Sequence, residues 1–138
     1  MTRWHPWRTL RGMPSVDIQW VDLPVEVRGY TRGATIVMSR HLRQDQRRAT
    51  LTHELLHQIA GHRAGCQHRD EPMITQLTAR LLITLSDLCA AAVWTTDPHE
   101  LAEALWVPVD VLAVRLGHLH VAEKGVLMRA TEHHRERA

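Results

Sequence analysis

The feature that most constrains this chain is the pattern His-Glu-x-x-His at positions 53–57, within a stretch that lacks glycine and proline, residues 43–60. Such a stretch predicts a helix. At ~100° per residue, His57 lies about 40° round that helix from His53, so both imidazoles can reach one ion. Glu54 lies beside the pair. The opposite arc of the helix is apolar and is predicted to be buried: Leu51, Leu55, Leu56 and Ile59.

The chemistry of this pattern points to a zinc peptidase. Histidine is the commonest metal ligand in proteins, and the chain has 11 histidines among 138 residues. We predict that His53 and His57 bind Zn²⁺ and that Glu54 acts as the general base that takes a proton from water at the metal. The helix would then bury one face and present these three side chains on the other.

A catalytic zinc needs a third protein ligand and an open position for water. Five side chains downstream could supply that ligand: His62, Cys66, His68, Asp70 and Glu71. We favour Glu71, because it begins the next predicted helix and a helical hairpin would bring that helix against the first. Pro72 argues against this choice, since the residue before a proline avoids helical dihedral angles. Asp70 and Glu71 could instead be acids that complement the dipole at a helix N-terminus.

The rest of the pattern predicts strands first and helices afterwards. Residues 16–21 alternate apolar and polar side chains and residues 34–39 are β-rich, so both are predicted strands. Pro24 and Gly29 mark a loop between them. Gly61 is predicted to end the histidine-bearing helix. Further helices are predicted over residues 4–11 and 70–91, from Asp97, from Pro108 to Gly117, and over residues 122–135.

This order of elements predicts a single α+β domain over residues 1–138, with a short β-sheet packed on the histidine-bearing helix and a helical C-terminal part. We place its core at residues 16–95 and a helix pair at residues 97–120. The pair resembles a helix-turn-helix, but Trp106 and Pro108 occupy the turn and the second helix carries a single arginine. It is therefore predicted to pack internally or to hold a protein partner, and nucleic-acid binding is not expected.

Composition limits the class of protein. Apolar residues make up 44% of the chain and charged residues 23%, as in a globular domain. A net charge of +2 is too small to argue for a nucleic-acid partner. No apolar run approaches the ~20 residues that cross a bilayer. The first residues contain no apolar signal core. A cytoplasmic protein without a membrane partner is expected, with Cys66 and Cys89 reduced.

Three segments resemble the ImmA/IrrE-type zinc metallo-endopeptidases, most closely the short versions found in actinobacterial phages and mobile elements. The segments are Thr35-Ile36-Val37, residues 47–57, and Glu71-x-x-Ile74 leading into residues 79–83. The likeness extends over residues 16–90, and residues 47–57 carry most of its specificity.

The resemblance implies a gluzincin-type, zincin-like core in which a small sheet packs on the active-site helix. It implies that a glutamate on the following helix, Glu71 by position, is the third zinc ligand. It also implies a protein substrate, because members of this family cleave, or are proposed to cleave, a partner transcriptional repressor in phage and mobile-element regulation. Some members act without demonstrated proteolysis.

The sequence therefore predicts a zinc-dependent endopeptidase that cleaves a partner transcriptional repressor. The alternative is a non-catalytic repressor- or DNA-binding regulator with a structural zinc site, for which a fourth protein ligand such as Cys66 would be the sign. In the peptidase, the oxyanion could be stabilised by Tyr30, His62 or His118. The predicted strand at residues 34–39 could pair with an extended substrate segment.

Overall fold

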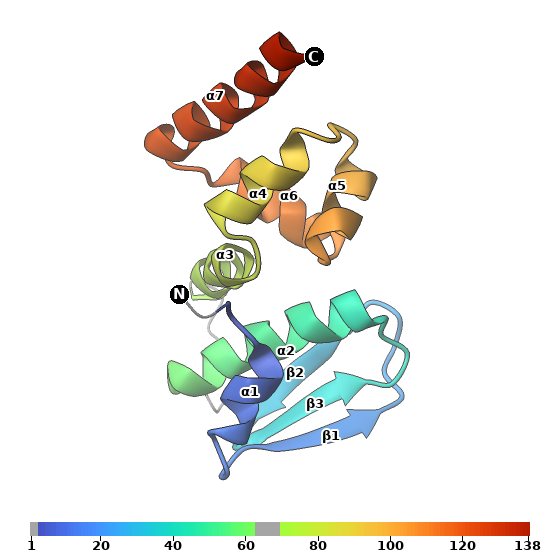
Figure 1. The fold of residues 1–138 in the computed structure, drawn as a ribbon. Helices are drawn as coiled ribbons and strands as arrows, with labels where there is room; N and C mark the ends of the chain where they lie inside the picture. Colours follow the sequence, from blue (N-terminus) through green and yellow to red (C-terminus); the bar gives the residue numbers. More distant parts are fainter. Residues whose placement is uncertain (1–2, 63–69) are drawn as a thin grey trace. The chain divides into compact units, whose positions relative to one another are not determined.

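The chain has the α+β fold that its sequence predicts (Figure 1). A computed structural model describes residues 3–62 and 70–138. In chain order the elements are α1 (Pro6–Arg11), β1 (Asp17–Val21), β2 (Gly29–Arg32), β3 (Thr35–Ser39), α2 (Gln44–Ile59), α3 (Glu71–Leu82), α4 (Leu85–Ala92), α5 (Pro98–Leu105), α6 (Val109–Gly117) and α7 (Val121–Arg137). They divide into two compact units, Met1–Thr78 and Ala79–Ala138, which are described separately.

The first unit contains a three-stranded sheet in the order β1-β3-β2. β3 pairs in parallel with β1, where Asp17 faces Thr35, and antiparallel with β2, where Arg32 faces Thr35. The strand predicted at residues 34–39 is thus present as β3, but it lies in the middle of the sheet. Both of its edges are already paired, so the expectation that this strand adds a substrate segment is wrong. β2 is the edge strand on that side.

β2 occupies residues for which the sequence predicted a loop. Its four residues connect to β3 through the two-residue turn Gly33-Ala34, and Gly33 has a φ of 60°. Left-handed backbone at the first turn position favours glycine there. Gly29 lies so close to its neighbours that a Cβ would stand 2.7 Å from the carbonyl oxygen of Val37 and 2.8 Å from Thr50. A side chain at Gly29 would push β2 away from β3 and α2.

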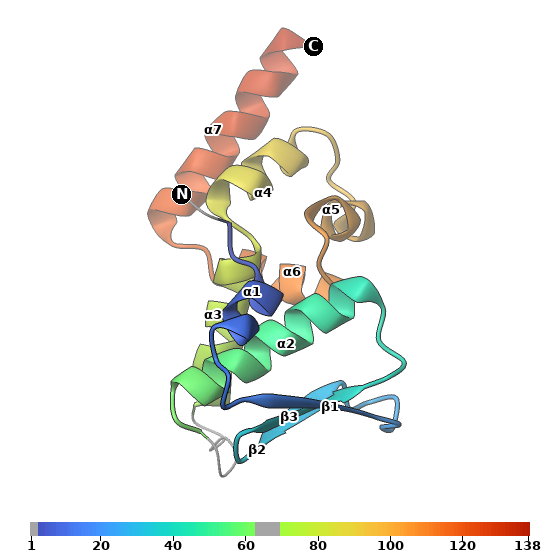
Figure 2. The ribbon, with the colours of Figure 1, turned by 60° about the horizontal axis from the view of Figure 1, so that its bottom comes forward.

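The histidine-bearing helix is α2, and it lies across one face of the sheet (Figure 2). Its apolar arc joins the core of the unit, which consists of Val16, Ile36, Met38, Leu51 and Leu55. Full burial of such a side chain contributes roughly 1.5–3 kcal/mol. Gln58 of α2 also donates a 2.7 Å hydrogen bond to the carbonyl oxygen of Gly33. The helix is therefore fixed both to the sheet and to the β2–β3 turn.

The single helix predicted over residues 70–91 is wrong, because the chain breaks between Leu82 and Leu85 into α3 and α4. Thr84 causes the break. Its backbone is extended, with φ −71° and ψ 154°, and its side chain accepts a hydrogen bond from the amide of Asp87. This is the geometry of an N-cap, so α4 begins as a new helix.

Among the described helices none is, on its own, long and apolar enough to cross a membrane, although α3 and α4 together pass the same test across their 65° bend.

The second unit is built from helices, and its α5–α6 pair is the predicted helix-turn-helix-like segment. Asp97 is the N-cap of α5, and its carboxylate accepts hydrogen bonds from the amides of His99 and Glu100. It ends at Trp106, which adopts a left-handed conformation with a φ of 58°. The arginine of α6, Arg115, is only 3% exposed. That side chain is directed into the unit and away from solvent, where a DNA backbone would have to meet it.

Arg115 forms part of an ion-pair network with Arg80 and Glu123. The carboxylate of Glu123 lies 2.8 Å from a guanidinium nitrogen of Arg115 and 2.9 Å from one of Arg80. Arg115 also donates from Nε to the carbonyl oxygen of Ile83 at 2.9 Å. The hydrogen bonds from Arg115 and then Arg80 hold the pKa of Glu123 far below its usual range. The network fixes the start of α7 to α6 and to the end of α3.

Replacing Glu123 by Gln is expected to lower the free energy of unfolding at pH 7 by roughly 3 kcal/mol, because the buried Arg115 loses its counter-charge. A carboxyl group whose pKa is lowered in the native state stabilises the folded protein fully at a pH above its ordinary pKa, 4.5. This stabilisation decreases progressively as the pH falls below that value. The difference between wild type and variant should therefore narrow on acidification, as measured by urea unfolding. Glu132→Gln, an exposed change on the same helix, should alter stability by less than about 0.5 kcal/mol. A difference that is constant with pH would contradict this assignment.

Candidate metal centre

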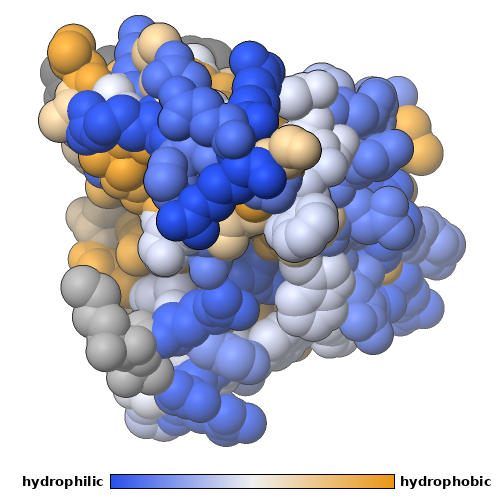
Figure 3. Space-filling model, turned by 45° about the horizontal axis from the view of Figure 1, so that its top comes forward, coloured by the Kyte–Doolittle hydropathy of each residue, from blue (hydrophilic) through white to orange (hydrophobic). Residues whose placement is uncertain are grey.

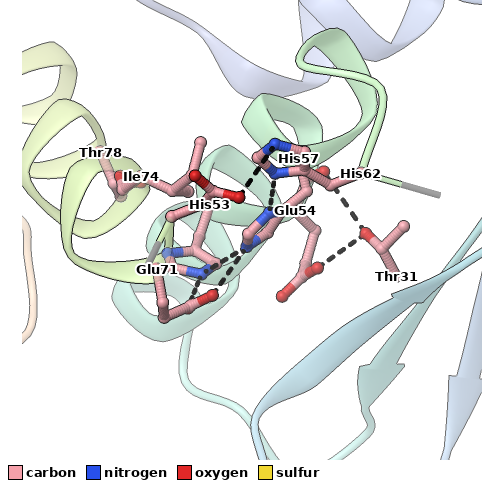
Figure 4. A network of polar contacts seen from close by, with 9 residues as sticks. Thr31, His53, Glu54, His57, His62, Glu71, Ile74 and Thr78 are labelled. Carbon is pink, nitrogen blue, oxygen red and sulfur yellow. Dashed lines mark hydrogen bonds and ion pairs between the residues drawn. The ribbon is translucent and has the colours of Figure 1, made fainter. Parts of the chain in front are cut away.

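Two helices bring three potential metal ligands together in the first unit. His53 and His57 lie on α2, and Glu71 is the first residue of α3 (Figure 4). The Nε2 atoms of the two histidines are 3.1 Å apart. The carboxylate of Glu71 bridges them, with Oε1 at 2.6 Å from His53 Nε2 and Oε2 at 3.2 Å from His57 Nε2. These three side chains could hold a metal ion, since one ligand atom from each lies within 4.8 Å of the others.

The spacing of these atoms fits a small tetrahedral ion. Two ligands about 2.0–2.1 Å from such an ion lie roughly 3.3 Å apart, and the two distances to His57 Nε2 are 3.1 and 3.2 Å. The Glu71 side chain is 45% exposed, so the cluster opens to solvent on that side. Two imidazoles and one carboxylate leave a fourth position of a tetrahedron to water or substrate.

His57 is held in the form that can bind a metal. Burial is the main cause of a lowered pKa at His57, and the neighbouring His53 and His62 lower it further, while Glu71 raises it. A lowered pKa keeps the imidazole neutral at neutral pH. Metal binding requires this neutral form, because it has a lone pair on one ring nitrogen.

Glu54 points away from the ligand cluster and toward β2. It is only 6% exposed, and its Oε2 accepts a hydrogen bond of 2.7 Å from the hydroxyl of Thr31. Burial raises the pKa of Glu54, and the Thr31 hydrogen bond is the largest opposing effect. Thr31 was not identified from the sequence. Thr31 lies on the short strand β2, which places its hydroxyl beside the carboxylate of Glu54, 23 residues further along the chain.

A pocket of about 260 Å³ lies beside these residues, and its walls come from β2, α2, the first residue of α3 and His62, which follows α2. The lining residues are Gly29, Tyr30, Thr31, Glu54, His57, His62 and Glu71. Two of the residues considered for oxyanion stabilisation, Tyr30 and His62, are therefore at the pocket. The third, His118, is not among the lining residues; it follows α6, and its Nδ1 lies 2.9 Å from the carbonyl oxygen of Val114 on that helix.

The other candidates for a third ligand take different positions. The Asp70 carboxylate lies 4.0 Å from His62 Nε2 and is not part of the cluster of His53, His57 and Glu71. Cys66 and His68 lie outside the described residues. Pro72 does not prevent Glu71 from starting α3, because proline is tolerated in the first helical turn, where an amide has no helical partner. The carbonyl oxygen of Asp70 accepts the helical hydrogen bond from Ile74 at 3.1 Å.

A larger pocket, about 650 Å³, lies in the second unit between the end of α4 and α7. The most exposed large hydrophobic residue that lines it is Trp94, which is 81% exposed and whose ring is tilted against that of His134. The lining residues include His134 and Arg135 but no acidic side chain or cysteine. Hydrophobic side chains also reach the surface elsewhere, in separate patches among hydrophilic ones (Figure 3). Among residues 3–62 and 70–138, the group of side chains that could together hold a metal ion is the one in the first unit.

Comparison with known families gives an independent indication of the kind of chemistry involved. The family model Peptidase M78, described as an IrrE N-terminal-like domain, matches residues 22–117. The chain belongs to the Peptidase M78 family. No curated protein matches it, and no solved structure does. The resemblance to ImmA/IrrE-type proteins is thereby confirmed.

The match indicates a metallopeptidase-type function for this M78 protein. The matched residues run from just after β1 to the end of α6, so they include both histidines, Glu54 and Glu71. The small sheet packed on the helix with both histidines is consistent with the zincin-like fold of the family. A peptidase family also implies a protein or peptide substrate.

Proposed function

We propose that this M78 protein is a zinc-dependent endopeptidase in which His53, His57 and Glu71 bind the metal and Glu54 is the general base. One observation carries the proposal. Two imidazole nitrogens and a carboxylate converge within 4.8 Å, and a second, buried carboxylate on the same helix lies at the adjoining pocket without joining them. A purely structural site would have no use for that second carboxylate.

The donor set supports zinc as the metal. Two imidazoles and one carboxylate, with the fourth position open, form a common ligand set of catalytic zinc sites. When bound, the ion supplies Lewis acidity, which lowers the pKa of water and polarises a peptide carbonyl group. His53 and His57 contribute neutral nitrogen ligands, and Glu71 contributes the charge that partly compensates the ion.

Glu54 moves the proton in this proposal. Thr31 donates to Oε2, which leaves Oε1 of Glu54 to accept a proton from the attacking water. The buried carboxylate then returns the proton to the amine of the departing peptide fragment. Burial makes Glu54 a stronger base, because it raises the pKa of the carboxyl group. The hydrogen bond from the Thr31 hydroxyl lowers this pKa and so limits the increase.

The edge of β2 supports an extended polypeptide as the substrate. β2 is the last strand on its side of the sheet, and three of its four residues line the pocket. A substrate segment that paired with this edge would place its backbone carbonyl groups beside Glu54 and the metal ligands. The resemblance to ImmA/IrrE-type proteins suggests that a partner transcriptional repressor supplies this segment.

The alternative function is a non-catalytic regulator with a structural zinc. A structural site is closed by a fourth protein ligand, whereas among residues 3–62 and 70–138 the cluster contains three. A DNA-binding version also finds little support, because Arg115, the arginine of α6, is buried and paired with Glu123. The number of protein ligands on the bound metal therefore separates the two functions.

Incubation with a candidate repressor tests the proposed function directly. Zinc-loaded protein should cut the product of the neighbouring repressor gene at a discrete position, identified by mass spectrometry of the fragments. A chelator should stop the cleavage, and added Zn²⁺ should restore it. An intact repressor together with a zinc ion held by four protein ligands would favour the regulator instead.

A further inference from the structure

We propose that His62 is a positioning residue for the metal ligand His57, and that Asp70 positions His62 in turn. This inference rests on the proposed metal site. His62 lies on the side of the His57 ring opposite the cluster, where the two Nδ1 atoms are 3.1 Å apart (Figure 4). The other ring nitrogen of His62, Nε2, lies 4.0 Å from the carboxylate of Asp70. The sequence had offered both residues as metal ligands, and the geometry assigns them another role.

The end of α2 explains how His62 reaches this position. The helix closes with a Schellman motif, in which the amide of His62 donates to the carbonyl oxygen of His57 at 2.9 Å and the amide of Gly61 donates to that of Gln58 at 3.1 Å. Gly61 has a φ of 81°, which turns the chain back over the last helical turn. The helix stop therefore places His62 beside His57 independently of any metal.

The valence of imidazole then determines where each proton lies. If His57 Nε2 binds a metal, its lone pair is used there, and the proton of the neutral ring would lie on Nδ1. That N–H faces His62 Nδ1, which must accept the hydrogen bond. The proton of His62 is then on Nε2, the atom that faces the Asp70 carboxylate. The contact between the two imidazoles is a hydrogen bond, whereas the contact of His62 with the Asp70 carboxylate, at 4.0 Å, is a longer electrostatic one.

This arrangement gives His57 a hydrogen-bond partner on its second ring nitrogen, as metal-binding histidines usually have. The nitrogen that does not bind the metal normally donates to a carboxylate, a carbonyl oxygen or water, and this partner fixes the tautomer and the orientation of the ring. Here the partner is a second imidazole. Both partners are partly shielded from solvent, with 21% of the His62 side chain and 32% of the Asp70 side chain exposed. His62 Nδ1, occupied in this way, is not free to bind the metal.

Zinc titration of the purified full chain tests this inference without any substrate. The zinc dissociation constant, measured by competition with a chromophoric chelator, should rise about 10–100-fold in His62→Ala, with one zinc per chain still bound at saturation. His62→Asn should recover part of the affinity, because its amide oxygen can accept from His57 Nδ1. Asp70→Asn should weaken binding less than His62→Ala does. His99→Ala, an exposed histidine on α5, is the control and should bind zinc like the wild type.

Two further measurements separate positioning from other roles. Thermal unfolding of the metal-free His62→Ala protein should match that of the metal-free wild type, and nitrogen NMR of the zinc-loaded wild type should show His57 protonated at Nδ1. A zinc affinity of His62→Ala equal to that of the wild type would overturn the inference. So would complete loss of stoichiometric zinc, since His62 would then be a ligand itself. Failure of the wild type to bind zinc at all would overturn the proposed function.

Discussion

Glu54→Gln should bind zinc with an affinity close to that of the wild type and should lose peptide cleavage by a factor of roughly 10²–10⁴ in kcat. Gln has nearly the same shape as Glu, and its amide oxygen can still accept the 2.7 Å hydrogen bond from Thr31. The buried side chain therefore keeps its position. What it loses is the ability to take a proton from water at any accessible pH.

The control for this change is Glu26→Gln, which alters an exposed carboxylate between β1 and β2. It should leave both zinc content and kcat unchanged. Zinc content of all three proteins is measured by elemental analysis, and cleavage is measured on the same substrate under zinc saturation. Cleavage by Glu54→Gln at the wild-type rate would exclude Glu54 as the base. If this variant lost its zinc, the loss of cleavage would be explained by impaired metal binding and would contradict the expectation that Glu54 is not a ligand.

The sequence was sufficient for the parts of the site that depend on local periodicity. His53 and His57 are four residues apart, so any helix through them brings their rings to one side. The apolar arc predicted for the same helix is largely buried, with Leu51 and Leu55 fully enclosed, although Ile59 is 59% exposed. Gly61 ends the helix as predicted, and its positive φ is the physical reason.

The parts that the sequence missed depend on contacts between distant segments. β2 has only four residues, too few for an alternating pattern to be visible. The sequence feature that could have indicated this strand is the glycine of the turn Gly33-Ala34, which lies between β-forming residues. Missing β2 concealed Thr31, and it also made β3 look like an available edge. The pairing order of strands is set by packing across the sheet, which periodicity along one strand does not report.

The choice of a third metal ligand was limited in the same way, because it too depends on contacts between separate segments of the chain. Five residues between 62 and 71 had a suitable donor, and sequence spacing alone could not rank them because the chain between two helices can follow many paths. The geometry at the start of α3 favours Glu71 over Asp70 as the proposed third ligand. The carboxylate of Glu71 contacts both histidines, whereas that of Asp70 is directed to His62. In our proposal, two adjacent residues at a helix start thus have different roles, Glu71 as a metal ligand and Asp70 as a partner of His62.

Glu71→Ala is therefore expected to remove stoichiometric zinc, whereas Asp70→Ala should retain it with weakened affinity. Loss of a direct ligand should exceed the roughly 10–100-fold loss that follows from removing an outer partner of a ligand. Glu71 offers the cleanest version of this test, because its side chain is 45% exposed and its removal leaves no large cavity. His57→Ala should lose zinc as well, but it also deletes a buried side chain, so its metal-free stability must be measured alongside.

Equilibrium dialysis against buffered Zn²⁺ measures the zinc bound per chain in each variant, and urea unfolding of the metal-free proteins shows whether the fold is retained. Glu71→Ala should unfold like the wild type in the absence of metal and differ from it only when zinc is present, because a metal that binds the native state alone stabilises that state. The reverse order, with Asp70→Ala losing all zinc and Glu71→Ala keeping it, would assign the third ligand to Asp70. The carboxylate near His62 would then belong to a metal ligand, and Asp70 would not be a positioning residue for His62.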